Sequence, residues 1–74
     1  MKRTPFNQWL GDQMRQRGLS NYDLAGALGV RYSTISGWRS QGRDPLPETV
    51  RQLGDYFGVP VEDVIALTKW AGRE

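Results

Sequence analysis

The sequence contains no cysteine and no histidine among its 74 residues. Without cysteine the chain can form neither a disulfide nor a thiolate metal site, and without histidine it lacks the most common zinc ligand and general base. No nucleophile paired with a base and no glycine-rich phosphate loop can be assembled from the remaining residues. We therefore expect no metal, no cofactor and no enzymatic activity, and a reducing, cytoplasmic setting.

Long apolar runs are absent as well. The polar start Met1-Lys2-Arg3-Thr4 leads into no apolar signal-peptide core, and no stretch is long enough to span a membrane. A chain of this length makes one domain, residues 1–74, with a small and dense core.

Charge is distributed unevenly along the chain. The formal net charge of +2 is weak evidence for a nucleic-acid partner, but two stretches, 1–17 and 31–51, are basic, whereas the residues from 52 onward are acidic. One side of the fold is therefore expected to attract phosphate. Arg15, Arg17 and Arg51 are interpreted as solvated charges.

Glycine and proline divide the chain into segments that lack the strict alternation of β-strands, which predicts an all-α fold of five short helices. The predicted helices are 5–17, one starting at Ser20 and ending at Gly29, 32–39, one from Pro47 to Gly58, and 60–70. Ser20 and Asp23 have the spacing of a capping box, and Thr4 is a candidate N-cap. Helical periodicity places these residues in the core: Phe6, Trp9, Leu10, Met14, Leu24, Ala25, Leu28, Ile35, Trp38, Val50, Leu53, Phe57, Val61, Val64, Ile65 and Thr68.

Two of these helices, between Ser20 and Arg39, are joined by a tight turn containing Gly29 and Val30. This is the geometry of a helix-turn-helix, in which the second helix enters the major groove of DNA. The side of that helix turned away from Ile35 and Trp38 is predicted to be open.

Several pieces of the sequence, in order and spacing, resemble the Cro/repressor-type helix-turn-helix family, also called the XRE family. They are Gly18-Leu19-Ser20, Asp23-Leu24-Ala25, Leu28-Gly29-Val30, Ser33-Thr34-Ile35-Ser36, Trp38, Pro45, and Leu53 through Tyr56-Phe57-Gly58-Val59 to Val64-Ile65. The resemblance covers about residues 6 to 67 and implies a compact five-helix, lambda-repressor-like domain that binds DNA.

The resemblance also implies roles for individual positions. Base contacts are expected from Arg31, Tyr32, Ser33, Ser36 and Gly37, and phosphate contacts from Ser20, Asn21, Arg39, Ser40, Gln41, Gly42 and Arg43. Gly37 is interpreted as permitting close approach of DNA, or alternatively as a fraying helix end. Tyr32 could instead cover apolar surface, and the serines could be ordinary solvated residues.

Two positions depart from the family pattern. Where the family often pairs a glutamate with an arginine of the first helix, this chain has Arg39 and Met14, which leaves Arg39 available for a phosphate. Arg31 replaces the usual serine or threonine cap of the recognition helix, at a cost on the order of 1 kcal/mol, and we expect a DNA contact to compensate.

Trp70 is predicted on the side of the last helix opposite to its core residues, with Leu67 nearby. We interpret this pair as a two-fold dimer contact.

The predicted function is a homodimeric, sequence-specific transcriptional regulator on double-stranded DNA. We expect it to be a repressor, because so short a chain has no room for a separate effector domain. The alternatives are a protein-interaction module of the same fold without DNA binding, and an antitoxin-like repressor that also holds a partner protein.

Overall fold

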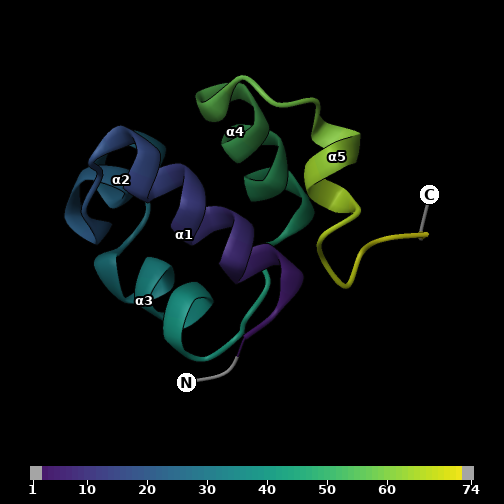
Figure 1. The fold of residues 1–74 in the computed structure, drawn as a ribbon, viewed down its shortest axis with the longest axis horizontal. Coiled ribbons are helices and arrows are strands. Elements are labelled where there is room, and N and C mark those ends of the chain that lie inside the picture. Colours follow the sequence, from purple (N-terminus) through teal and green to yellow (C-terminus); the bar gives the residue numbers. More distant parts are fainter. Residues whose placement is uncertain (1–2, 73–74) are drawn as a thin grey trace.

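The computed structural model describes residues 3–72, which form five helices and no strand. In chain order these are α1 (Pro5–Arg17), α2 (Asn21–Leu28), α3 (Tyr32–Ser40), α4 (Pro47–Phe57) and α5 (Val61–Ile65). α1 crosses the middle of the molecule, with α2 and α3 on one side and α4 and α5 on the other (Figure 1). The predicted all-α, five-helix fold is confirmed.

The helix ends are fixed by local capping. The Thr4 hydroxyl accepts a hydrogen bond from the backbone N–H of Asn7 at 3.1 Å, and the Asn7 side chain accepts one from the Thr4 N–H at 3.0 Å. The predicted capping box of α2 is present too, with distances of 2.9 and 3.1 Å between Ser20 and Asp23. Each box satisfies N–H groups that a helix start otherwise leaves without a partner.

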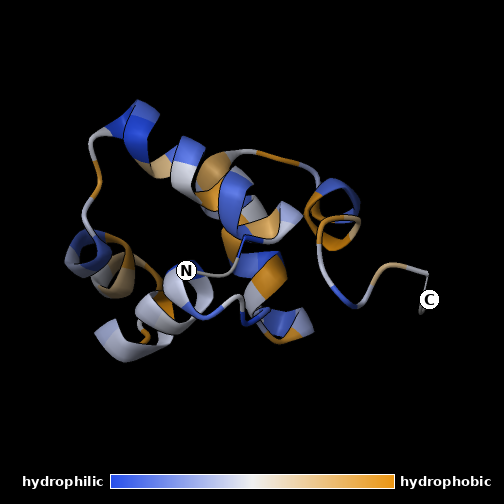
Figure 2. Cartoon of the chain, turned by 60° about the horizontal axis from the view of Figure 1, so that its bottom comes forward, coloured by the Kyte–Doolittle hydropathy of each residue, from blue (hydrophilic) through white to orange (hydrophobic). Residues whose placement is uncertain are grey.

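α1 is the helix around which the core is built. Its Phe6 ring packs in a T-shaped arrangement with Trp38 of α3, with centroids 6.0 Å apart, and its Trp9 ring does the same with Phe57 of α4 at 5.6 Å. Figure 2 shows hydrophobic residues gathered between the helices and hydrophilic ones mostly along the outside. Pro45 is fully buried although it was not predicted in the core. The buried residues that form the hydrophobic core were all predicted: Phe6, Leu10, Met14, Leu24, Ala25, Leu28, Ile35, Trp38, Val50, Leu53, Phe57 and Val64.

Arg17 is exposed, as predicted, and its side chain also contacts the end of α4. Its guanidinium donates to the carbonyl oxygen of Phe57 at 3.1 Å and lies 4.9 Å from the centroid of the Phe57 ring. The side chain thereby links the end of α1 to the end of α4 through a hydrogen bond and a cation–π contact.

The last helix is shorter than predicted. α5 ends at Ile65, and the chain continues as turns to residue 72. Within residues 3–72 no helix is long and apolar enough to cross a membrane.

Candidate nucleic-acid interface

The elbow between α2 and α3 has the predicted helix-turn-helix form. Gly29 ends α2 in the left-handed conformation, with φ 69°, which glycine adopts without steric cost. The N–H of Val30 then donates to the carbonyl of Ala25 at 3.0 Å, and Val30 packs against the core. The turn therefore sets the direction of α3 relative to α2 through backbone bonds and one apolar contact.

α3 has one buried side and one open side. Ile35 is fully buried and Trp38 is 4 % exposed, so these two side chains anchor the helix in the core. Tyr32, Ser33 and Thr34 are exposed, and Ser36 is half-buried. The open side predicted for this helix is present at its first turn. Thr34 is exposed there too, although it was not predicted to be part of the open side.

Gly37 lies in a different environment from the one expected. It is buried, and a Cβ added to it would lie 3.4 Å from Cδ of Arg43. The backbone N–H of Arg43 also donates to the carbonyl of Gly37 at 3.3 Å. The absence of a side chain at Gly37 thus makes room for the Arg43 stem and not for an approaching DNA backbone. A base contact by Gly37 remains a prediction.

Arg31 starts α3 as its N-cap and, among residues 3–72, makes no side-chain capping bond. Its side chain is exposed. The replacement of the family's capping residue by Arg31 therefore leaves the first N–H groups of α3 without a capping side chain. It also puts a positive charge beside them.

Arg39 and Asn21 are two predicted phosphate contacts that the fold brings together. The Arg39 guanidinium donates a hydrogen bond of 2.8 Å to Oδ1 of Asn21 at the first residue of α2. The bond fixes the Asn21 amide, so that its oxygen is occupied and its NH₂ group remains a donor. In the family the residue at the position of Arg39 commonly pairs with an arginine of the first helix. Here that position of α1 is occupied by Met14, which is buried and carries no charge.

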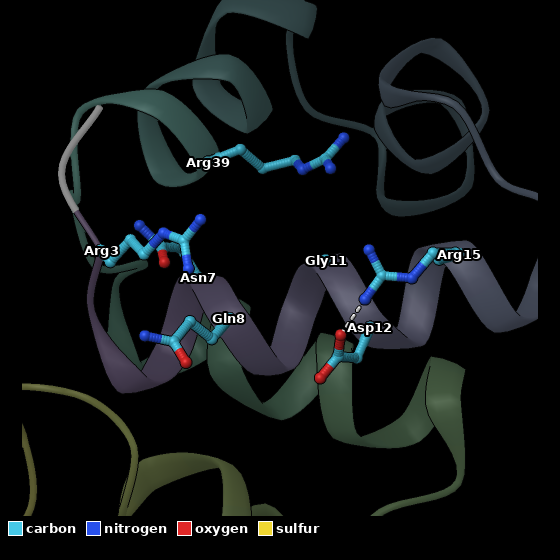
Figure 3. Close-up of a pocket in the computed structure, with 7 residues that line it drawn as sticks. All are labelled: Arg3, Asn7, Gln8, Gly11, Asp12, Arg15 and Arg39. Atoms are coloured by element: carbon cyan, nitrogen blue, oxygen red, sulfur yellow. Dashed lines mark hydrogen bonds and ion pairs between the residues drawn. The ribbon is translucent and has the colours of Figure 1, made fainter.

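A polar cleft lies beside this bond, between α1 and α3. It has a volume of about 260 Å³ and is lined by Arg3, Asn7, Gln8, Gly11, Asp12, Arg15 and Arg39. Figure 3 shows Arg39 reaching across the cleft above Gly11, with Arg3 towards one end and Arg15 towards the other. Asp12 pairs with Arg15. Three guanidinium groups against one carboxylate leave this cleft positively charged.

The remaining predicted phosphate contacts lie at helix ends and in the loop after α3. The Ser20 hydroxyl accepts the Asp23 N–H, and the Ser40 hydroxyl donates to the carbonyl of Ser36 at 2.7 Å. Gln41 and Arg43 are exposed, and Gly42 has a φ of 69°. The turn at Gly42 directs the chain back so that Arg43 covers Gly37 at the end of α3.

One feature of the site was missed by the sequence analysis. The ring of Tyr22 in α2 stacks on the ring of Tyr32 at the start of α3, with centroids 4.3 Å apart and an interplanar angle of 28°. No periodicity within either helix signals a pairing between them, because it depends on the angle at the elbow.

The predicted dimer residues lie in the turns after α5. Leu67 and Trp70 are half-buried and pack against the core of their own chain. The premise that Trp70 faces away from the core was wrong, because the helix ends before it and the chain folds back. A dimer contact through these residues remains a prediction.

Comparison with known proteins assigns the chain to a family. The family model described as "Helix-turn-helix" matches residues 10–64. The cryptic phage CTXphi transcriptional repressor RstR of Vibrio cholerae is 26% identical over 61 residues, which cover 82% of this chain and 55% of that protein. The chain thus spans about half the length of this relative. No solved structure gives a significant match. Because the family model covers more than half of the residues, including both helices of the elbow, the chain belongs to the helix-turn-helix family.

Proposed function

We propose that this chain represses transcription by inserting α3 into the major groove of double-stranded DNA. Its membership of the helix-turn-helix family and its similarity to a phage transcriptional repressor support a role as a DNA-binding transcriptional regulator. The observation that carries the proposal is the two-sidedness of α3, which is locked into the core by Ile35 and Trp38 while Tyr32 and Ser33 remain in solvent. A helix held in this way can enter a groove without any rearrangement of the core.

The phosphate contacts in this proposal flank α3 on two sides. Arg43 lies at the C-terminal end of the helix, and the bonded pair of Arg39 and Asn21 lies beside the start of α2. Each of these groups can donate hydrogen bonds to a phosphate oxygen, and charged donors make the stronger bonds. The cleft beyond Arg39 adds Arg3 and Arg15 to the same positive surface.

The base contacts in this proposal come from Arg31, Tyr32, Ser33 and Ser36. A base contact by Gly37 additionally requires the Arg43 stem that covers it to move. Hydroxyl groups can donate to or accept from either base of a pair, and an arginine near the groove prefers guanine. Because one short helix reads only a few base pairs, we propose that the protein acts as a homodimer on two half-sites about one DNA turn apart. The cytoplasmic setting and the absence of enzymatic activity are parts of the same proposal.

Selection from a pool of random duplexes tests the proposal. We expect enrichment of a two-fold symmetric sequence, and an affinity that falls steeply as salt rises. Arg43→Ala is expected to weaken all duplexes alike and to reduce the magnitude of the slope of log K against log salt by about 1. Ser36→Ala is expected to change which sequences are preferred.

Arg51→Ala is the matched control, because Arg51 is an exposed arginine on α4 beside Val61 and Ile65, away from α3. It should leave both the affinity and the preferred sequence almost unchanged. If no duplex is enriched and binding does not respond to salt, the proposal is wrong and the protein-interaction alternative is favoured.

A further inference from the structure

Two exposed tyrosines form a stacked pair across the helix-turn-helix elbow. Tyr22 is the second residue of α2 and Tyr32 the first of α3, and their rings lie 4.3 Å apart at their centroids. Tyr22 is 72% exposed and Tyr32 is 42% exposed. Neither ring belongs to the buried core formed within residues 3–72.

This exposure makes the pair hard to explain as packing alone. Apolar ring surface left in water does not contribute to folding, and this stack leaves most of the Tyr22 ring in solvent. The pair nevertheless determines where the Tyr32 ring lies, because one of its faces rests against Tyr22. Tyr32 is the aromatic residue at the open end of α3, where base contacts are proposed.

We propose that Tyr22 is a positioning residue for sequence recognition. Its ring holds Tyr32 in the orientation in which the edge of the Tyr32 ring meets the C5-methyl group of a thymine in the major groove. This inference rests on the proposed function of α3 and adds to it a base preference and a residue, Tyr22, that is outside the reading helix.

The choice of thymine follows from the chemistry of the groove. The thymine methyl is the apolar group that a base pair presents in the major groove, and apolar side chains contact it there. A free tyrosine side chain must lose rotamer freedom when it binds, whereas a ring already stacked loses less. Loss of the stack is therefore expected to weaken binding to the preferred site by about 2- to 10-fold.

The test uses the duplex recovered by selection and five proteins: the unmodified chain, Tyr22→Ala, Tyr22→Phe, Tyr32→Ala and the double alanine variant. Tyr22→Ala should weaken binding to the preferred site about 2- to 10-fold and leave non-specific binding unchanged. Tyr22→Phe keeps the stacked ring and should bind as the unmodified chain does. In the Tyr32→Ala background, Tyr22→Ala should have no further effect.

The DNA supplies an independent measurement. Replacing the contacted thymine by uracil removes only the methyl group, and should weaken binding of the unmodified chain and of Tyr22→Phe but not of Tyr22→Ala. Tyr56→Ala is the matched control, because Tyr56 is a tyrosine on α4 with a similar exposure of 43% to that of Tyr32. Tyr56→Ala should change neither the binding to the preferred site nor the effect of replacing thymine by uracil. In the free protein, the NMR shifts of the Tyr32 ring protons should change in Tyr22→Ala and persist in Tyr22→Phe.

Three results would overturn the inference while leaving the proposed function intact. They are equal binding of Tyr22→Ala and the unmodified chain to the selected duplex, an equal loss of specific and non-specific binding, and a uracil effect that is the same in both proteins. Failure to select any duplex would instead overturn the proposed function, and this inference with it.

Discussion

Nε1 of the Trp70 indole lies 2.7 Å from the carbonyl oxygen of Pro45, to which it donates a hydrogen bond. The backbone N–H of Lys69 donates to the Asp44 carboxylate, also at 2.7 Å. The two bonds fix the segment after α5 against the loop that joins α3 to α4. That loop begins with Gln41 and carries Arg43, so the C-terminal segment is bonded to the loop that holds a proposed phosphate contact.

Replacing Trp70 is therefore expected to affect stability. Trp70→Phe keeps a ring but leaves the Pro45 carbonyl without this donor, at a cost of about 1 kcal/mol in the free energy of unfolding. Trp70→Ala also loses the ring contacts of a half-buried side chain and should cost about 2 to 3 kcal/mol. Urea unfolding measures both changes. A Trp70→Ala variant as stable as the unmodified chain would contradict the packing role.

The same variant tests the predicted dimer contact. Sedimentation at high protein concentration should show a dimer for the unmodified chain and a monomer for Trp70→Ala if Leu67 and Trp70 form the two-fold interface. An unchanged mass in Trp70→Ala would remove these residues from the interface and leave only their packing role.

Gly26 and Gly54 form a matched pair of helical glycines with opposite surroundings. Apart from its chain neighbours and the backbone of its own helix, a Cβ at Gly26 in α2 would meet no atom of residues 3–72 within 4 Å. A Cβ at Gly54 in α4 would lie 2.7 Å from the carbonyl oxygen of Val59. Gly26→Ala should stabilise the fold by about 0.5 to 1 kcal/mol, because alanine favours a helix. Gly54→Ala should destabilise it by about 1 to 3 kcal/mol, because the turn before α5 must move. Denaturant midpoints that shift in the same direction would contradict this contrast.

Arg31 is expected to favour DNA binding at the expense of stability. Arg31→Ser supplies a capping hydroxyl to α3 and removes a positive charge from its N-terminus, which should raise the free energy of unfolding by about 1 kcal/mol. The same change removes a donor near the groove and should weaken DNA binding. Thermal unfolding and a binding titration on one preparation measure the two effects, and a gain or a loss in both together would rule out the trade-off.

The ionisation of Asp23 is expected to make the stability of the fold depend on pH, because its carboxylate caps the start of α2. Its pKa is lowered below the ordinary aspartate value of 3.8, mainly because its carboxylate accepts the Ser20 backbone N–H and further because of the Ser20 hydroxyl. A carboxyl group with a lowered pKa in the folded state stabilises the fold fully above the unfolded value, and the contribution is lost as the pH falls through the folded pKa. The stability difference between the unmodified chain and Asp23→Asn should therefore be present at pH 6 and shrink below about pH 4. A difference independent of pH would argue against the ionised cap.

Local chemistry accounts for most of the correct sequence predictions. The bounds of α1 follow from Thr4, Pro5 and Gly18, and those of α2 from the Ser20 capping box and Gly29, because caps act within one helical turn. Most predicted core residues are buried, and Trp9, Val61 and Ile65 are partly buried against the core, because helical periodicity fixes which side chains share a face.

The features that were missed depend on contacts between distant segments. Arg39 meets Asn21 across 18 positions, Arg17 meets Phe57 across 40, and Trp70 meets Pro45 across 25. None of these separations leaves a periodic signal in the sequence. The early end of α5 belongs to the same class, because the bonds from Lys69 and Trp70 to the preceding loop favour a turn over further helix.

Substitution of individual atoms in the selected duplex tests the groove assignment most directly. Replacing purines by their 7-deaza analogues removes an acceptor from the major groove alone, whereas replacing guanine by inosine removes the amino group from the minor groove alone. With α3 in the major groove, 7-deazapurines facing Tyr32 to Ser36 should weaken binding by about threefold to tenfold, and inosine should have little effect. A loss of binding with inosine and none with 7-deazapurines would contradict the account.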